Sequence, residues 1–176
     1  MRILPYSSCK AVPTSELMMY ECSDRLLVPR SMESYTPLTI LMIENFLKET
    51  VVGCVYQVHE IEAEVIYAPS WMFYQLSICY DVRVSIIPPV RCTHLRLQPH
   101  RPDRFTTPDA VSLLNKALLN YKSVTQHTRI LIQMNPPEHV TVELTHPERY
   151  KTCFLHESED IQVTILMPVM PPYPMH

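Results

Sequence analysis

A single glycine, Gly53, stands against 17 prolines in the 176 residues of this chain. Glycine is the residue that most readily supplies a positive φ, and phosphate-binding loops need it for close approach of the backbone. The sequence therefore excludes a P-loop and a glycine-rich dinucleotide-binding turn, and with them two large classes of enzyme. It also predicts that turns with positive φ use Asn or Asp, or that the chain has no such turns.

The remaining composition indicates a globular protein. Hydrophobic residues make up 47% of the chain, and its length fits one ordinary domain or two small ones that share an interface. A net charge of −3 leaves no basic face for nucleic acid or anionic lipid. No apolar run reaches the roughly 18–20 residues that span a bilayer, and Pro5 interrupts the first apolar stretch too early for a secretory signal. We expect a soluble intracellular protein without a membrane span or a nucleic-acid partner.

The six cysteines are separated by 13 residues or more, and no CxxC pair occurs. The strong zinc signature is therefore missing. An even number permits disulfides, but scattered cysteines in a chain that is not secreted are more often reduced and buried. We expect free, buried thiols.

The first half of the chain has the pattern of short strands that end at prolines. Predicted strands cover 25–28 (RLLV), 39–46 (TILMIENF), 54–58, 63–67 and 82–87 (VRVSII), the last of which stops at Pro88-Pro89.

Two strand ends in this half resemble each other. In LLVPRSMESY (26–35) and IYAPSWMFYQ (66–75), Pro29 aligns with Pro69 and Met32 with Met72 at an offset of 40. Proline suits the first turn of a helix, because its missing N–H has no partner there in any case. Each stretch therefore predicts a strand followed by a short helix, and the pair suggests an internal pseudo-twofold repeat.

The second half contains the best helix signal, over 106–122 (TTPDAVSLLNKALLNYK). Thr107 is the expected N-cap, Pro108 takes the first helical position, and Asp109 complements the helix dipole. One apolar stripe at helical spacing follows, made by Ala110, Val111, Leu114, Ala117, Leu118 and Tyr121.

The rest of this half predicts a small α+β unit, with the helix packed on antiparallel strands. Strands are expected at 129–134, 140–144 and 160–166, whereas 94–105 (HLRLQPHRPDRF) has the look of a polar, proline-rich connection. We expect the boundaries 1–92 and 93–167 for the two subdomains and a proline-rich tail over 168–176, extended and poorly ordered.

Candidate chemical groups are few. The tightest set in sequence is Cys153 and His156, with His139 and His146 nearby, but a lone CxxH is a weak zinc signal. Glu60 and Glu62 share one face of a probable strand and fit a solvated edge better than an acid–base pair. HESED (156–160) fits a solvated hairpin tip. We assign no catalytic residue, no cofactor site and no metal site.

Two aromatic segments leave alternatives open. Trp71, with Met72 and Phe73, is either core or a shallow contact with a partner. Pro171-Pro172-Tyr173-Pro174 is close to a proline-tyrosine ligand of WW domains but lacks the residue between the prolines and the tyrosine. That segment is either a flexible end or a polyproline II ligand for a groove.

An ordered series of motifs resembles the ubiquitin fusion degradation protein 1 family. YAPSWM (67–72) is similar to that family's Leu-Pro-x-Trp-Met stretch, and RLLVPRSMESYTPL (25–38) is similar to its earlier strand-Pro-Pro-Ser-Ala segment. The resemblance spans about residues 20–166. In the stretch 97–132 the matching positions, in the family's order, are Gln98, Pro99, Asp103, Phe105, Pro108, Ala117, Leu118 and Asn120.

The resemblance implies a mainly β protein. A double-psi β-barrel subdomain of two interleaved repeats would be followed by a small α+β subdomain. It also implies a non-enzymatic adaptor that binds ubiquitin or polyubiquitin chains on substrates. With a second adaptor subunit, such proteins deliver substrates to a valosin-containing-protein type AAA ATPase for degradation, including ER-associated degradation. The implied location is the cytoplasm, with the nucleus and the cytosolic face of the ER as further places.

The chain departs from the family in two places. After the Trp-Met helix the family has glycines and acidic residues, whereas this chain has SICYDVRV (77–84). The family's C-terminal region, with its ATPase-binding motifs and partner-adaptor segment, is absent from the 176 residues, and a Phe-Ser-Gly type motif is excluded because Gly53 is the only glycine. We expect either another route to the ATPase or a different use of the fold.

Two rival functions remain. The chain is alternatively a divergent copy of the fold that serves as a structural subunit of a large protein assembly. Double-psi barrels also occur in proteases and decarboxylases, but neither an Asp-Thr/Ser-Gly nor a Gly-Ser setting occurs here. The sequence assigns no residue to ubiquitin binding.

Overall fold

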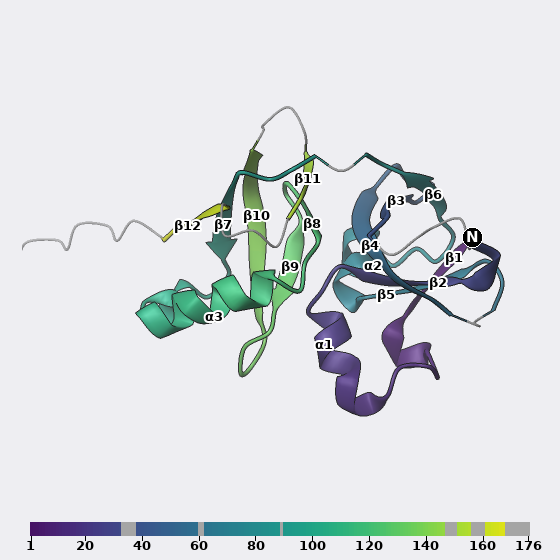
Figure 1. The fold of residues 1–176 in the computed structure, drawn as a ribbon, viewed down its shortest axis with the longest axis horizontal. Helices are drawn as coiled ribbons and strands as arrows, with labels where there is room; N and C mark the ends of the chain where they lie inside the picture. The colour runs from purple at the N-terminus through teal and green to yellow at the C-terminus, as the bar shows by residue number, and fades with distance from the viewer. Residues whose placement is uncertain (33–37, 60–61, 89, 147–150, 156–160, 168–176) are drawn as a thin grey trace, which may run out of the picture.

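The computed structural model describes residues 1–32, 38–59, 62–88, 90–146, 151–155 and 161–167. Within them the chain is a mixed α/β protein, mostly strands in three sheets with few short helices (Figure 1). The helices are η1 (Tyr6–Ser8), η2 (Thr14–Glu16), α1 (Leu17–Glu21), η3 (Arg30–Met32), α2 (Ser70–Gln75), η4 (Pro102–Phe105) and α3 (Pro108–Leu118), where η marks a 3₁₀ helix.

The strands fall into two groups along the chain. Those before residue 87 are β1 (Arg2–Pro5), β2 (Arg25–Pro29), β3 (Ile40–Glu44), β4 (Thr50–His59), β5 (Val65–Ala68) and β6 (Arg83–Ile86). Those after residue 93 are β7 (His94–Pro99), β8 (Ser123–Thr125), β9 (Arg129–Ile132), β10 (Glu138–His146), β11 (Thr152–Phe154) and β12 (Gln162–Ile165).

The first group forms one six-stranded sheet in the order β1-β5-β2-β4-β3-β6. The β1–β5 and β2–β4 pairs are parallel. The β3–β4 and β3–β6 pairs are antiparallel, and β2 meets β5 in antiparallel fashion at Leu27 and Tyr67. As paired, these strands do not close a barrel among the described residues, because β1 and β6 are the sheet's two edges.

A short bridge lies between these two edges. Arg2 in β1 pairs in antiparallel fashion with Asp81, which comes just before β6. The N–H of Ile3 donates to the carbonyl of Tyr80 at 2.8 Å, and the N–H of Val82 donates to the carbonyl of Met1 at 2.9 Å.

The predicted change from strand to short helix is confirmed at both prolines. β2 ends at Pro29 and continues into η3. β5 is followed by Pro69, whose φ of −58° suits the N-cap position that it occupies before α2. Neither proline takes the first helical position that the sequence had suggested: Pro29 is the last residue of β2, and Pro69 is the N-cap residue of α2.

The prediction for turns with positive φ was wrong. Among the described residues, those with positive φ are Leu38, Lys48, Glu64, Ser77, Ile78 and His127, and none of these is Asn or Asp. At Lys48 the reason is visible: the side-chain oxygen of Asn45 accepts hydrogen bonds from the N–H groups of Leu47 and Glu49, each at 3.0 Å. Asparagine stabilises this turn through its side chain and leaves the left-handed position to its neighbour.

Gly53 does not have a positive φ. It lies in β4, and a Cβ atom there would come within 2.8 Å of Leu26 Cγ and 2.9 Å of the Asp24 carbonyl oxygen. The only glycine of the chain is therefore used for the close approach of β2 to β4.

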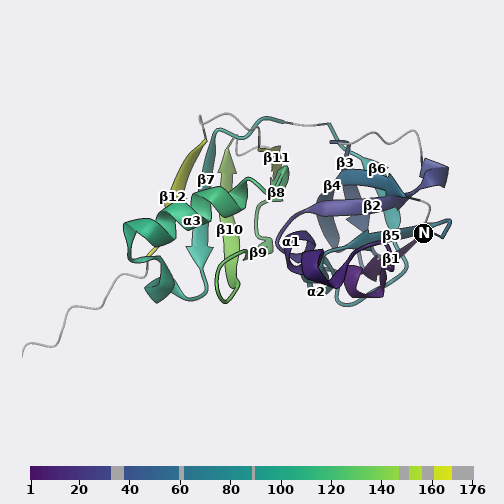
Figure 2. The same cartoon turned by 60° about the horizontal axis from the view of Figure 1, so that its bottom comes forward.

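The second group of strands forms a four-stranded sheet, β12-β7-β10-β9, and a two-stranded sheet, β11-β8. Helix α3 lies across one face of the four-stranded sheet in both views (Figures 1 and 2). The predicted helix is confirmed: Thr107 Oγ1 accepts from the N–H of Ala110 at 3.2 Å. Of the stripe, Val111 is half-buried and the other five residues are buried.

Two expectations about this half were wrong. Residues 94–99 are a central strand, β7, in which Leu95 and Leu97 are fully buried while Arg96 is exposed. The alternation of apolar and polar residues typical of a strand was therefore present in this proline-containing segment. The sheet is not purely antiparallel either, because β12 runs parallel to β7. β1, α1, β8 and β11 had no predicted counterpart, since runs of three to five residues carry too little periodicity.

The two groups of strands share a core. One apolar cluster runs from Ile3 and Leu26 in the six-stranded sheet to Leu114 and Val142 in the second half. A smaller cluster around Tyr6, Tyr20, Leu27, Val65 and Tyr67 packs the N-terminal helices onto β2 and β5. Among the described residues, none of the helices combines the length and the apolar character needed to cross a membrane.

Candidate functional site

The histidines and cysteines do not gather into a site. In the part of the chain that the structure describes, no group of three or more His, Cys, Asp or Glu side chains is placed to hold a metal ion. His139 lies in β10 and Cys153 in β11. Several predicted candidates, among them His156, the side chain of His146, Glu60, the stretch 156–160 and the proline-tyrosine segment 171–174, lie outside the described residues.

All six cysteines are free, and five of them are buried, as expected. Burial raises the pKa of Cys22 and of Cys54 to about 12. The hydrogen bond to Cys92, together with burial, raises the pKa of Cys153. These three thiols keep their protons at neutral pH, whereas a nucleophilic cysteine needs a lowered pKa.

The residues of the first family-like motif lie where the six-stranded sheet meets the second half. Trp71 and Met72, in α2, are buried. The indole N–H of Trp71 donates to the carbonyl of Ser23 at 2.9 Å, and its ring lies 6.2 Å from that of Tyr121, centroid to centroid. Pro29 and Pro69 stand at the ends of the two strands described above. Trp71 and Met72 belong to the core that the two halves share, and Trp71 also lines the second cavity described below.

The second family-like motif surrounds helix α3. Gln98 and Pro99 end β7, Phe105 is buried in η4, and Pro108 begins α3. Leu118 is buried at the end of the helix, and the N–H of Asn120 caps the carbonyl of Ala117 at 3.1 Å. These residues fix the start and the end of α3 against the sheet.

A buried carboxylate joins the two halves, and no sequence signal pointed to it. Asp24 is fully buried, and its oxygens accept hydrogen bonds from the N–H groups of Lys122 and Ser123, at 2.9 and 2.8 Å, and from the Ser123 hydroxyl at 2.7 Å. Burial raises the pKa of Asp24 from 3.8 to about 6, and the hydrogen bonds lower it in part. The oxygens of Asp24 have hydrogen-bond partners and no surface exposed to solvent. Asp24 therefore links the two halves of the fold and is not placed for catalysis.

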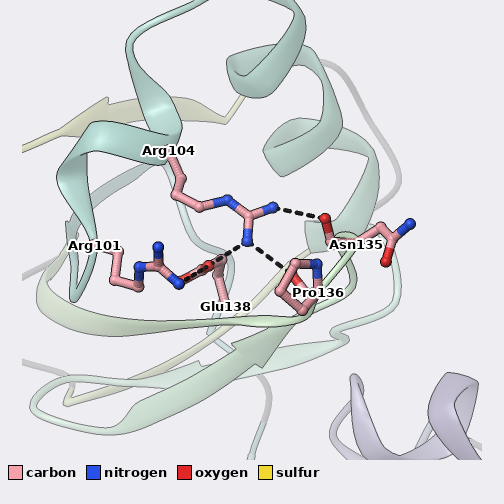
Figure 3. Close-up of polar contacts among 5 residues, drawn as sticks. All are labelled: Arg101, Arg104, Asn135, Pro136 and Glu138. Atoms are coloured by element: carbon pink, nitrogen blue, oxygen red, sulfur yellow. Dashed lines mark hydrogen bonds and ion pairs between the residues drawn. The ribbon is translucent and has the colours of Figure 1, made fainter.

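A polar cluster holds the start of β10 to η4 (Figure 3). Arg104 Nη1 lies 2.6 Å from Glu138 Oε1, and Arg101 Nη1 lies 3.7 Å from the same oxygen. Arg104 also donates to the carbonyls of Asn135 and Pro136, at 2.9 and 3.3 Å. The carboxylate of Glu138 is thereby buried and paired with two guanidinium groups.

An apolar groove between α3 and the edge strand β12 is the best candidate for binding a partner. Its cavity has a volume of about 460 Å³. Val111 and Leu119 line it from the helix side, and Val163 and Ile165 from the strand side. Leu119 stands 61% exposed. Apolar side chains that remain open to solvent between a helix and a sheet edge are typical of a binding groove.

A second exposed apolar feature lies on two loops of the six-stranded sheet. Phe46 and Leu47 are 76% and 57% exposed, and Ile78 is 56% exposed. Their loops are neighbours, because Asn45 Nδ2 donates to the carbonyl of Leu76 at 2.9 Å and Ser77 Oγ donates to Glu49 Oε2 at 2.9 Å. We call these three residues the loop patch.

A scan against models of known protein families finds no match, and a search among curated proteins finds no significant match.

Proposed function

We propose that this protein is a non-enzymatic adaptor that binds ubiquitin or polyubiquitin chains, as the substrate-side domain of the ubiquitin fusion degradation protein 1 family does. Its further partners would be a valosin-containing-protein type AAA ATPase and a second adaptor subunit, in the cytoplasm. The six-stranded part would be a double-psi β-barrel. The proposal rests on the resemblance in sequence and on one structural observation.

That observation is the symmetry of strand pairing in the six-stranded sheet. Exchanging β1, β2 and β3 with β4, β5 and β6 converts the parallel β1–β5 pair into the parallel β4–β2 pair. The antiparallel β2–β5 and β3–β6 pairs are unchanged. The antiparallel β3–β4 pair would become a β6–β1 pair. In its place there is the antiparallel bridge between Arg2, in β1, and Asp81, just before β6.

The symmetry agrees with the repeat in the sequence. Leu27 and Tyr67, which pair across β2 and β5, are 40 residues apart, the same offset as between Pro29 and Pro69. Two interleaved copies of a strand–helix–strand unit are the arrangement that the resemblance implies. The observation supports the family's fold, and through it the family's function.

We place ubiquitin on the groove between α3 and β12. Two exposed leucines form a matched pair: Leu119, the C-cap residue of α3, lines the groove, whereas Leu113, within α3, is 45% exposed and does not line it. Burying a leucine side chain at an interface contributes about 1.5–3 kcal/mol, which is about a tenfold to hundredfold change in affinity.

The test is retention of the purified protein on immobilised ubiquitin chains. At about 100 μM protein, contacts of about −5 kcal/mol register. We expect the parent and Leu113→Ser to be retained and Leu119→Ser to be lost. Absence of retention of the parent would refute ubiquitin binding. Retention of Leu119→Ser at the parental level would show that ubiquitin binds to a surface other than the groove.

The loop patch favours one alternative, a structural subunit of a large assembly. Exposed aromatic and aliphatic side chains at neighbouring loop tips are a feature of subunit contacts. Gel filtration of native extract separates the two functions. Elution only with a megadalton complex that lacks ubiquitin and the AAA ATPase would favour the structural role.

A further inference from the structure

A second cavity, of about 410 Å³, opens between α2 and the strands β9 and β10. Trp71, Tyr74 and Gln75 line it from α2, Arg129 from β9 and His139 from β10. The site therefore draws on both halves of the chain. It shares no lining residue with the groove at α3, so its function does not depend on ubiquitin binding.

The cleft carries the positive charge of Arg129, which no described acidic side chain pairs with. Arg129 is exposed and has no ion-pair partner among the described residues. The closest acidic residue in sequence to His139 is Glu138, and its carboxylate is already paired with Arg104 and Arg101 (Figure 3). The guanidinium group of Arg129 is thus available to a ligand, and its planar fork suits two parallel hydrogen bonds.

His139 adds an uncharged donor. Its Nδ1 atom is buried and has no hydrogen-bond partner in the described part of the chain. Burial and the charge of Arg129 lower the pKa of His139, and the same two causes lower that of His100, whose ring centroid lies 6.1 Å away. Both rings are therefore neutral at pH 7. With no acceptor near Nδ1, the proton of the neutral His139 ring is better placed on Nε2.

The remaining walls are aromatic and amide. Both Trp71, which is buried, and Tyr74, which is 74% exposed, line the cleft. Flat aromatic surfaces of this kind bury an apolar side chain at low entropic cost. The amide of Gln75 supplies one further donor.

We propose that this cleft binds a carboxylate of an acidic peptide segment, with Arg129 and His139 on the carboxylate and Trp71 and Tyr74 on the apolar residue beside it. The single positive charge of the Arg129 guanidinium group balances the single negative charge of a carboxylate, whereas a phosphate carries a charge of about −1.5 to −2 at pH 7. The charge of the cleft therefore fits a carboxylate better than a phosphate. The carboxylate belongs either to an internal acidic residue or to the end of a chain.

The experiment follows the fluorescence of Trp71, which is the only tryptophan and lies in the cleft. Three N-acetylated peptides are titrated to about 1 mM. The first has an internal aspartate before phenylalanine and an amidated C-terminus, the second ends in a free phenylalanine carboxylate, and the third is amidated and has phenylalanine but no carboxylate. Inorganic phosphate is titrated as a fourth probe. Isothermal calorimetry gives a second readout that does not depend on the indole.

We expect at least one of the two peptides with a carboxylate to bind, and the stronger of them identifies the source. Arg129→Gln should weaken that binding by about tenfold or more, because a hydrogen-bonded charge is lost. Arg96→Gln, an exposed arginine in β7 outside the cleft, should leave it unchanged. Binding of no peptide, equal binding of the uncharged peptide, tighter binding of phosphate, or an unchanged affinity in Arg129→Gln would each overturn the proposal.

Discussion

The buried hydrogen bond between the Ser123 hydroxyl and Asp24 provides the sharpest test of how the two halves are joined. Ser123→Ala removes this one donor, which lies 2.7 Å from Asp24 Oδ2, and leaves the two backbone donors in place. Ser123 is only 2% exposed, so water does not replace the lost hydroxyl easily. A hydrogen bond to a charged group contributes about 1.5–3 kcal/mol, and we expect a loss of that size in the free energy of unfolding at pH 7.

The loss should depend on pH in a definite direction. The pKa of Asp24 is about 6 in the folded chain and ordinarily 3.8, a difference that corresponds to about 3 kcal/mol. Because the folded form binds the proton more tightly, the stability from this group is fully present below about pH 4 and is lost as pH rises through about 6. Ser123→Ala raises this pKa further, so the variant and the parent should differ most near pH 7 and least near pH 4.

The assay is urea unfolding, followed by the fluorescence of Trp71, at several pH values. Ser77→Ala is the matched control, because its hydroxyl also donates to a carboxylate, Glu49, but at the surface. The control should unfold like the parent. If Ser123→Ala unfolds like the parent at pH 7, or if the difference grows towards pH 4, the assignment of an ionised, hydrogen-bonded Asp24 at neutral pH is wrong.

Three further substitutions test the core, each through its effect on the stability of the fold. Gly53→Ala should destabilise by about 1–3 kcal/mol, because the added methyl group meets Leu26 and the Asp24 carbonyl within 3 Å; unchanged stability would mean that β2 and β4 separate freely. Leu114→Asp should unfold the second half, since a fully buried carboxylate without a partner costs several kcal/mol; a parental melting temperature would contradict the stripe on α3. Asn45→Ala should lower the free energy of unfolding by about 2–4 kcal/mol, because the buried Asn45 side chain makes hydrogen bonds to Leu76 and to the turn that follows Asn45. Thermal unfolding like that of the parent, followed by circular dichroism, would refute this.

Much of the local structure was predictable because it depends on neighbouring residues. Thr107 and Pro108 define the start of α3, and the apolar spacing that follows defines its buried face. Pro29 and Pro69 mark two strand ends in the same way. β7 was missed because Pro99 and the prolines that follow it hid a short alternation. Its central place, between β10 and β12, depends on tertiary structure. Three of the residues with positive φ, Leu38, Lys48 and Ile78, are of types that no local preference selects for this conformation.

The sequence by itself determined which classes of site are excluded, where the main helix begins, and which two strand ends repeat. These features depend on residue type and on spacing within about one turn or one strand. Only the tertiary structure decided that Asp24 lies against Ser123, 99 residues away, and that Trp71 shares a cleft with Arg129 and His139. Pairs so distant in the chain leave no periodic pattern, because their contact depends on how the two halves pack and not on either segment alone.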